Sequence, residues 1–369
     1  MSCSGAFAKV TDTERGDVNS FNLEKSKREA PGSESSIKPM KAVVLTRFGS
    51  PDVLQLKEVE KPRPKDEEVL LKVHATAIND WDWQFMRGRP LALRLIFGIF
   101  KPKVEILGAE VSGRVEAVGK NVTRFQPGDD VYGDISACGF GGFAEYVCAH
   151  EDALVRKPPE MSFEEATSLP HASMLAMQGL IDCGRIQEGQ KLLINGAGGG
   201  VGTLGVQIAK LYGAETTGVD SGAKLDMLRS VGFDHVIDYE REDFTDNGQQ
   251  YDLILDTKTN RSTLRYARSL RPHGAYVTVG GQLGRLLQAL FFGPLISLFS
   301  KKRIRIVALE PNKDLDRVNE LFQAGKLKCV LDGPFDLRDV PEAIQLFGAG
   351  RHKGKVVISV ATPQEQSFR

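Results

Sequence analysis

A glycine-rich segment between a short apolar run and a helix-like pattern constrains the fold of this chain most. Lys191–Asn195 has the apolar, β-prone composition of a buried strand, and the turn that follows, 196–202, contains five glycines. Apolar residues then recur at helical spacing on one face: Val201, Leu204, Ile208 and Leu211. Glu215–Val219 predicts a second strand. Such alternation of strand and helix is typical of a parallel sheet covered by helices.

The glycine-rich turn carries the pattern of a dinucleotide-binding site. Ala197, Gly199 and Gly202 occupy the three fingerprint positions, with alanine in place of the first glycine. The chain must turn sharply there, its backbone must approach a pyrophosphate closely, and the first helical N–H groups then face the anion. Because the flanking strand and helix are both present, we prefer this interpretation to a purely structural turn. It assigns cofactor binding to Gly199, Gly200, Val201 and Gly202.

Residues after the second strand are candidates for the ribose end of the cofactor. Asp220 lies close to the offset of about 20 residues at which an acid accepts the ribose hydroxyls of NAD. Ser221 and Lys224 supply a hydroxyl and an ammonium, the groups that a 2′-phosphate needs. Lys224 has a competing interpretation as a solvated lysine on a helix face. Tyr239, after the third expected strand, is placed to cover the adenosine end.

The sequence pattern changes near Ser162. Between Lys41 and Pro159, short β-like runs alternate with glycine and proline turns, which predicts a mostly β, barrel-like domain. Beyond Ser162, further strands are expected over His235–Asp238, Asp252–Asp256 and Ala275–Val279, and a helix over Asp314–Ala324.

Charge and cysteine content exclude several classes of function. The 48 basic residues balance 48 acidic ones, so no net field favours nucleic acid, and we expect no nucleic-acid partner. The five cysteines are scattered and form no C-x-x-C pair, which argues against a disulfide framework or a cysteine-based zinc site.

Two segments bear on location. Residues 1–39 are polar and lack apolar periodicity, so we expect a disordered tail, and its many acids do not fit a mitochondrial leader; the expected location is the cytoplasm. Leu283–Phe299 is strongly apolar but is interrupted by Gly293 and Pro294. Since a spanning helix needs about 20 unbroken apolar residues, we expect buried surface there, with contact to a membrane interface as the alternative.

Six linked motifs resemble the zinc-independent quinone oxidoreductases of the medium-chain dehydrogenase/reductase superfamily. They occur in that family's order and spacing: GAEVSGRVEAVG, FQPGDDVYG, GGFAEY, LLINGAGGGVGTLGVQIAK, VIDYEREDF and YDLILDT. The resemblance implies an α/β chain with a GroES-like, mostly β catalytic domain, residues 40–163 and 311–361, and a Rossmann cofactor domain with a doubly wound parallel sheet, residues 164–310. Residues 362–369 would form a C-terminal tail.

The resemblance also implies that no metal is bound. In the superfamily's zinc enzymes a histidine precedes a glutamate, whereas here Ala109 precedes Glu110. The other two ligand positions fall near Asn79 and Met177, and amide, methyl and thioether groups do not hold zinc tetrahedrally.

Without zinc, the expected substrates are quinones or α,β-unsaturated carbonyls, which accept hydride without Lewis-acid activation. Asn79 and Asp82 match the family's N-x-x-D turn, with Asn79 facing cofactor or substrate and Asp82 holding the loop. Gln84 stands where many members have a tyrosine, so water becomes the expected proton source.

NADPH is the expected cofactor, ahead of NADH, because Ser221 and Lys224 match the family's phosphate-binding residues. Two other functions stay open: an enoyl-thioester reductase, and a catalytically idle NADPH-binding protein with a regulatory or structural role. The resemblance further implies a homodimer formed through an edge strand near Ala275–Val279.

Overall fold

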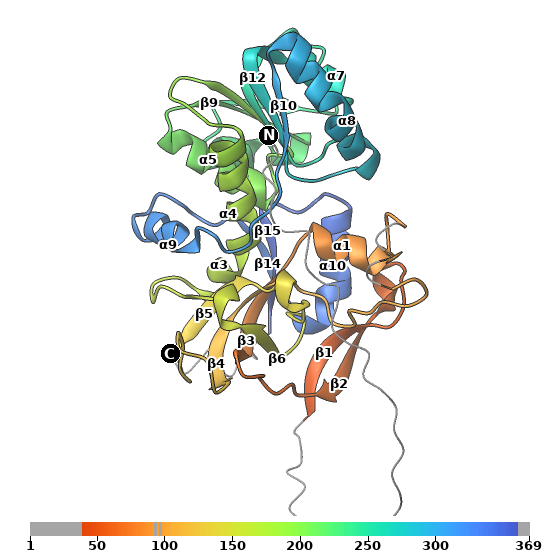
Figure 1. Ribbon diagram of the computed structural model, residues 1–369, viewed down its shortest axis with the longest axis vertical. Coiled ribbons are helices and arrows are strands. Elements are labelled where there is room, and N and C mark those ends of the chain that lie inside the picture. Colours follow the sequence, from red (N-terminus) through yellow and green to blue (C-terminus); the bar gives the residue numbers. More distant parts are fainter. Residues whose placement is uncertain (1–38, 92–93, 96–97, 361–369) are drawn as a thin grey trace, which may run out of the picture. The chain divides into compact units, whose positions relative to one another are not determined.

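The computed structural model describes residues 39–91, 94–95 and 98–360 (Figure 1). The expected tail at 1–38 and the expected C-terminal tail at 362–369 lie outside the described residues. Strand β1, Pro39–Leu45, includes Pro39, the last residue that was assigned to the expected N-terminal tail.

A six-stranded sheet is built from the middle of the chain (Figure 1). Its order is β10-β9-β8-β11-β12-β13, and every neighbouring pair is parallel. The strands are β8 (Lys191–Asn195), β9 (Glu215–Asp220), β10 (His235–Asp238), β11 (Tyr251–Asp256), β12 (Leu270–Thr278) and β13 (Arg303–Ile306). The connecting helices are α5 (Gly200–Leu211), α6 (Leu225–Val231), α7 (Thr263–Arg268) and α8 (Leu283–Ser300). The predicted Rossmann-type α/β fold is confirmed.

Both faces of this sheet are buried, which explains its continuous apolar strands. Leu192 and Ile194 of β8 belong to one hydrophobic cluster, whereas Leu193 belongs to another, which contains Tyr266 of α7. Successive side chains of a strand point to opposite faces, so a strand covered on both sides must be apolar throughout.

The position of β12 corrects one expectation. The segment Ala275–Val279 was predicted to form the edge strand of a dimer, but β12 lies between β11 and β13. The short strand β13, which was not predicted, occupies that edge instead. Its four residues lie just after the apolar run and overlap the basic cluster 301–305, so they did not show the pattern of a separate strand.

The second large sheet joins strands from both ends of the described chain. Its order is β14-β15-β3-β4-β5-β7, and β6 pairs with β3. These strands are β3 (Glu68–Ile78), β4 (Glu110–Val118), β5 (Asp130–Asp134), β6 (Tyr146–His150), β7 (Val155–Arg156), β14 (Leu331–Asp336) and β15 (Lys355–Ser359). β1 pairs separately with β2 (Leu54–Glu60). This mostly β part is the predicted GroES-like fold.

The remaining helices are short. They are α1 (Asp80–Arg87), α3 (Phe163–Ser168), α4 (Pro170–Met177), α9 (Leu315–Gln323) and α10 (Val340–Gly348), with a π-helical turn at Gln178–Cys183. Single 3₁₀ turns lie at Pro51–Val53, Ser136–Cys138, Glu151–Ala153, Gly222–Lys224 and Leu337–Asp339.

The return of the chain before β15 brings the two sheets' elements together. Gly354 N donates to Gly198 O at 2.8 Å, and Gly199 and Gly354 form an isolated parallel bridge. β15 then pairs antiparallel with β3. Residues just before and at the start of β15 therefore lie against the glycine-rich turn.

Helix α8 differs from the expectation of buried surface. Only 11% of its 18-residue apolar window is buried. Ala289 and Gly293 are its buried residues, and Gly293 packs against Ile304 of β13. The remaining apolar side chains of α8 are mostly exposed (Figure 1 shows the helix on one face of the six-stranded sheet).

Candidate cofactor and active site

The glycine-rich turn leaves open space beside Gly199, at the N-terminus of helix α5, but is tightly packed at Gly202. Gly199 caps α5 with extended backbone, and a Cβ built on it would meet its nearest atom, His352 Nε2, at 3.7 Å. A Cβ on Gly202 would lie 2.3 Å from the carbonyl oxygen of Ala197. Gly202 is thus required for close contact between turn and helix. Gly199 instead leaves open the space that the N–H groups of α5 face, where an anion is favoured.

Lys224 and Asp220 form a buried pair beside this turn. Their side chains are 5% and 7% exposed, with Lys224 Nζ 3.3 Å from Asp220 Oδ1. A Cβ on Gly198 would meet Lys224 Cδ at 2.5 Å, so the lysine stem crosses the turn. Burial lowers the pKa of Lys224, and the charge of Asp220 partly offsets this. The interpretation of Lys224 as a solvated lysine is wrong.

Asp220 is fully engaged by protein groups. Oδ2 accepts from Gly198 N at 2.8 Å, and Oδ1 accepts from Ser221 N at 2.9 Å while facing Lys224. Ser221 is half-buried at the end of β9, and its backbone oxygen accepts from Lys224 N. The structure therefore joins the predicted residues Asp220, Ser221 and Lys224 in one cluster that also holds the glycine-rich turn in place.

A cavity of about 230 Å³ adjoins that cluster. Tyr239 is 50% exposed at its rim, and its backbone N–H donates to Asp220 O. The lining residues are Asn195, Gly196, Val219, Asp220, Tyr239, Phe244, Lys258, Asn260 and Arg261. Two cations in this lining, Lys258 and Arg261, were not singled out in the sequence.

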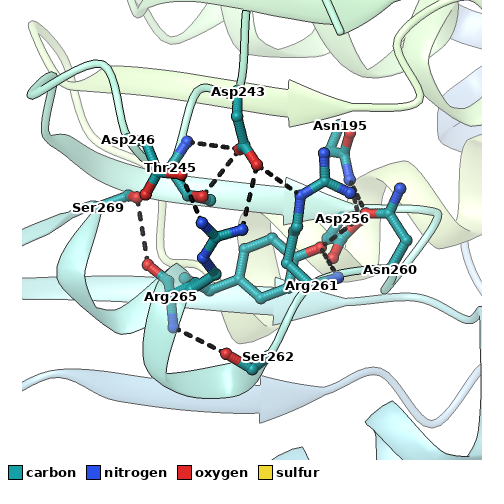
Figure 2. A network of polar contacts seen from close by, with 11 residues as sticks. Asn195, Asp243, Thr245, Asp246, Asp256, Asn260, Arg261, Ser262, Arg265 and Ser269 are labelled. Atoms are coloured by element: carbon teal, nitrogen blue, oxygen red, sulfur yellow. Dashed lines mark hydrogen bonds and ion pairs between the residues drawn. The ribbon is translucent and has the colours of Figure 1, made fainter. Parts of the chain in front are cut away.

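A polar network holds Arg261 at the cavity (Figure 2). Its Nε donates to Asp243 Oδ2 at 3.0 Å, and the same oxygen accepts from Arg265 at 3.2 Å. On the other side of the network, Asn195 Nδ2 donates to Asp256 Oδ1 at 2.8 Å. Arg261 is therefore held in one orientation while it lines the cavity.

His352 is a second residue that the sequence did not reveal. It is 5% exposed and stacks on Phe347 with ring centroids 4.7 Å apart. Its Nδ1 is buried without a hydrogen-bond partner among the described residues. Burial, followed by the positive charges of Lys224 and Lys258, lowers the pKa of His352 to about 3. A neutral imidazole with one free nitrogen thus borders Gly199.

The predicted catalytic turn begins helix α1. Asn79 is buried, its Oδ1 accepts from Trp81 N at 3.0 Å, and its own N–H donates to Asp82 Oδ2 at 2.9 Å. Asp82 Oδ1 accepts from Gly108 N at 2.9 Å. Burial raises the pKa of Asp82 to about 7. Through these bonds Asp82 fixes the loop, whereas the Asn79 side chain is left to face Glu110.

A buried carboxylate connects this turn to the cofactor turn. Glu110 is fully buried and ion-paired with Lys355, and it accepts from His171 N at 2.8 Å. Asn79 Nδ2 lies 3.4 Å from Glu110 Oε2. Lys355 Cδ would lie 3.4 Å from a Cβ on Gly200. The Lys355 side chain thus runs from the glycine-rich turn to the Asn79 turn.

His171 contributes its side chain to a buried ion pair. It lies inside α4, and its Nδ1 is 3.0 Å from Asp134 Oδ2 in a buried pair. The side chain is therefore held by β5 rather than capping the helix.

The residues at the three former ligand positions give no metal donor set. Asn79, Ala109 and Met177 are all buried. Within 39–91, 94–95 and 98–360, no group of three or more His, Cys, Asp or Glu side chains is arranged to hold a metal ion.

The site fits a dinucleotide on its own geometry. An open glycine precedes the 12-residue helix α5, which offers N–H groups to a pyrophosphate. Lys224, Lys355 and the Nε2 atom of His352 lie beside the same turn. Positive charge next to the N–H groups that begin a helix favours an anionic ligand.

Two family models match the chain. The alcohol dehydrogenase GroES-like domain matches residues 65–159, and the zinc-binding dehydrogenase family matches residues 231–358. Together they cover parts of both sheets.

Named relatives match over most of their length. The chain is 33% identical over 330 residues to 2-methylene-furan-3-one reductase of Solanum lycopersicum, covering 86% of this chain and 79% of the relative. It is 30% identical over 332 residues to the chloroplastic NADPH-dependent alkenal/one oxidoreductase of Arabidopsis thaliana, covering 87% and 80%. Among solved structures, the quinone oxidoreductase from Coxiella burnetii matches with a TM-score of 0.77 at 28% identity, covering 88% of this chain and 100% of that one.

Proposed function

Because the chain belongs to the quinone oxidoreductase-like branch of the medium-chain dehydrogenase/reductase superfamily, we propose that it uses NADPH to reduce quinones or α,β-unsaturated carbonyls without zinc. The chain is an oxidoreductase by its relatives. The observation that carries the proposal is the position of Lys355, which lies beside Gly200 of the glycine-rich turn and pairs with Glu110, whose carboxylate contacts the Asn79 side chain. A dinucleotide bound with its pyrophosphate at the glycine-rich turn would have its nicotinamide end near Asn79.

The preference for NADPH rests on the charge around Asp220. A free carboxylate there would repel a 2′-phosphate, but Asp220 already has two N–H donors and Lys224. Lys258 and Arg261 add two cations to the adjoining cavity. Lys258, together with Arg261 that is already paired with Asp243, is the positive charge available to a 2′-phosphate there.

Zinc independence rests on the chemistry of the side chains present. Glu110 is the one acid of the family's ligand motif that this chain keeps, and it is committed to Lys355, His171 N and Asn79. A bound nicotinamide supplies hydride, so the acceptor must already be electron-poor, as a quinone or enone is.

Asn79 and water complete the chemistry. The Asn79 amide is oriented by Trp81 N and Glu110, and it has a second N–H that can donate to the oxygen on which charge develops. Gln84 bonds to Asp80, at 3.4 Å, and offers no acidic proton. Water therefore supplies the proton that neutralises the reduced oxygen or adjacent carbon.

Two further features are proposed with this function. The free edge of β13 is a suitable surface for a homodimer, since an unpaired edge strand readily pairs with another chain. The polar composition of residues 1–39, with acidic residues that do not fit a mitochondrial leader, supports a cytoplasmic location.

The experiment combines coenzyme binding with turnover. NADPH should bind about tenfold or more tightly than NADH, the size of one charge-assisted hydrogen bond, and should be oxidised with a small quinone or a 2-alkenal. Lys224→Ala should remove the preference, whereas Lys326→Ala, at an exposed lysine, should keep it. Thermal melting checks that each variant is folded. An unchanged preference in Lys224→Ala excludes that residue from the phosphate site, and binding without turnover of either substrate favours the idle NADPH-binding protein.

A further inference from the structure

Helix α8 exposes a large apolar surface. Its window Leu283–Ser300 is the one helix within 39–91, 94–95 and 98–360 that is long and apolar enough to cross a membrane. Six of its large apolar side chains are more than half exposed: Leu290, Phe291, Phe292, Leu295, Leu298 and Phe299. A contiguous apolar patch on one helix marks a binding surface more often than a chance exposure.

The packing of α8 against the sheet limits the orientation in which this helix can contact a bilayer. Gly293 sits against Ile304 of β13, with a Cβ position only 3.1 Å from it, and Ala289 is 4% exposed. Spanning a bilayer would require the helix to leave the sheet on which Gly293 and Ala289 are packed. The helix can therefore only lie flat, with one side on the sheet and the other exposed.

The charge of this region is strongly asymmetric. The whole chain has equal numbers of basic and acidic residues, yet residues 257–309 contain ten Lys and Arg and no Asp or Glu. Four of the ten follow α8 directly: Lys301, Lys302, Arg303 and Arg305. Lys302 Nζ donates to Ala267 O and Arg303 donates to Gly184 O, so both bind carbonyls rather than carboxylates.

We propose that α8 docks the protein on an anionic phospholipid bilayer. The exposed apolar face enters the boundary between headgroups and acyl chains, and the basic cluster 301–305 binds lipid phosphates. An apolar helix face beside cations that have no carboxylate partner is complementary to a bilayer with anionic headgroups and apolar acyl chains.

The test uses the full chain and vesicle flotation. The protein should float with vesicles of phosphatidylcholine and phosphatidylglycerol and bind at least about tenfold more weakly to phosphatidylcholine alone or in high salt. Leu298→Glu with Phe299→Glu should abolish binding, since these side chains are 75% and 83% exposed and contribute little to the core. Lys301→Glu should weaken it. Leu56→Glu, at an exposed residue of β2, is the matched control and should bind normally.

Three outcomes would overturn the proposal. One is a wild-type protein that stays with the soluble fraction in the presence of anionic vesicles. Another is binding that survives the Leu298→Glu, Phe299→Glu substitutions in a folded variant. The third is a dimer, detected by sedimentation, that those substitutions dissociate, because α8 would then be covered by a second copy. None of these measurements involves turnover, so the result is independent of the proposed reaction.

Discussion

His352 makes the stability of this protein depend on pH in a defined window. Burial, and then the nearby Lys224 and Lys258, lower its pKa to about 3, whereas an unfolded chain has a histidine pKa near 6.5. The unfolded chain therefore takes up the proton first. The contribution of His352 is complete above pH 6.5 and is lost as the pH falls from 6.5 toward 3.

The magnitude follows from one proton. Each pH unit inside the window removes about 1.4 kcal/mol, and because the window opens near pH 6.5 the loss at pH 5.5 relative to pH 8 is about 1.4 kcal/mol. His352→Phe keeps an aromatic ring beside Phe347, whose ring lies 4.7 Å from the native imidazole, but removes the titration. The variant should lose correspondingly less stability on acidification.

The assay is urea unfolding of wild type and His352→Phe at pH 8 and pH 5.5. Comparing the two proteins cancels the titrations that they share. His273→Asn, at an exposed histidine, serves as the matched control. If His352→Phe and wild type lose the same free energy between the two pH values, His352 is not held neutral by its surroundings, and the argument is refuted.

Further substitutions test the glycine-rich turn and the buried ion pair. Gly202→Ala places a Cβ 2.3 Å from Ala197 O and should lower the free energy of unfolding by about 1–3 kcal/mol, measured by urea titration. Gly199→Ala has room for its Cβ, so it should melt like wild type yet bind NADPH about tenfold or more weakly in a fluorescence titration; equal loss of stability in both variants would contradict this distinction. Lys355→Met leaves Glu110 buried and unpaired and should cost about 3–5 kcal/mol, and adding Glu110→Gln should restore part of it. A double variant no more stable than Lys355→Met would mean that the unpaired charge is not the cause.

The sheet could be predicted because its strands are buried on both faces. A run such as Lys191–Asn195 is apolar without alternation, and the next glycine-rich turn fixes where the helix begins. The boundary between α8 and β13 could not be predicted. Because α8 is apolar around its whole circumference, its sequence shows no helical periodicity that would identify a buried face. For the same reason the sequence could not show that its outer face is exposed.

The parts of the cofactor site that could be predicted are formed by residues close together in the sequence. The glycine-rich turn and the cluster at Asp220 and Lys224 are near one another along the chain, although their mutual burial was not foreseen. His352 and Lys355 were missed, since their approach to the turn depends on the pairing of β15 with β3. Nothing in their own spacing indicates that contact, and a histidine or lysine near a chain's end has many roles.

The bridge between Gly199 and Gly354 joins two segments that are synthesised at different times. The glycine-rich turn leaves the ribosome long before His352 and Lys355 exist, so a nascent chain presents the phosphate cradle without the side chains that later line it. The complete set of side chains around the turn forms only when β15 pairs with β3.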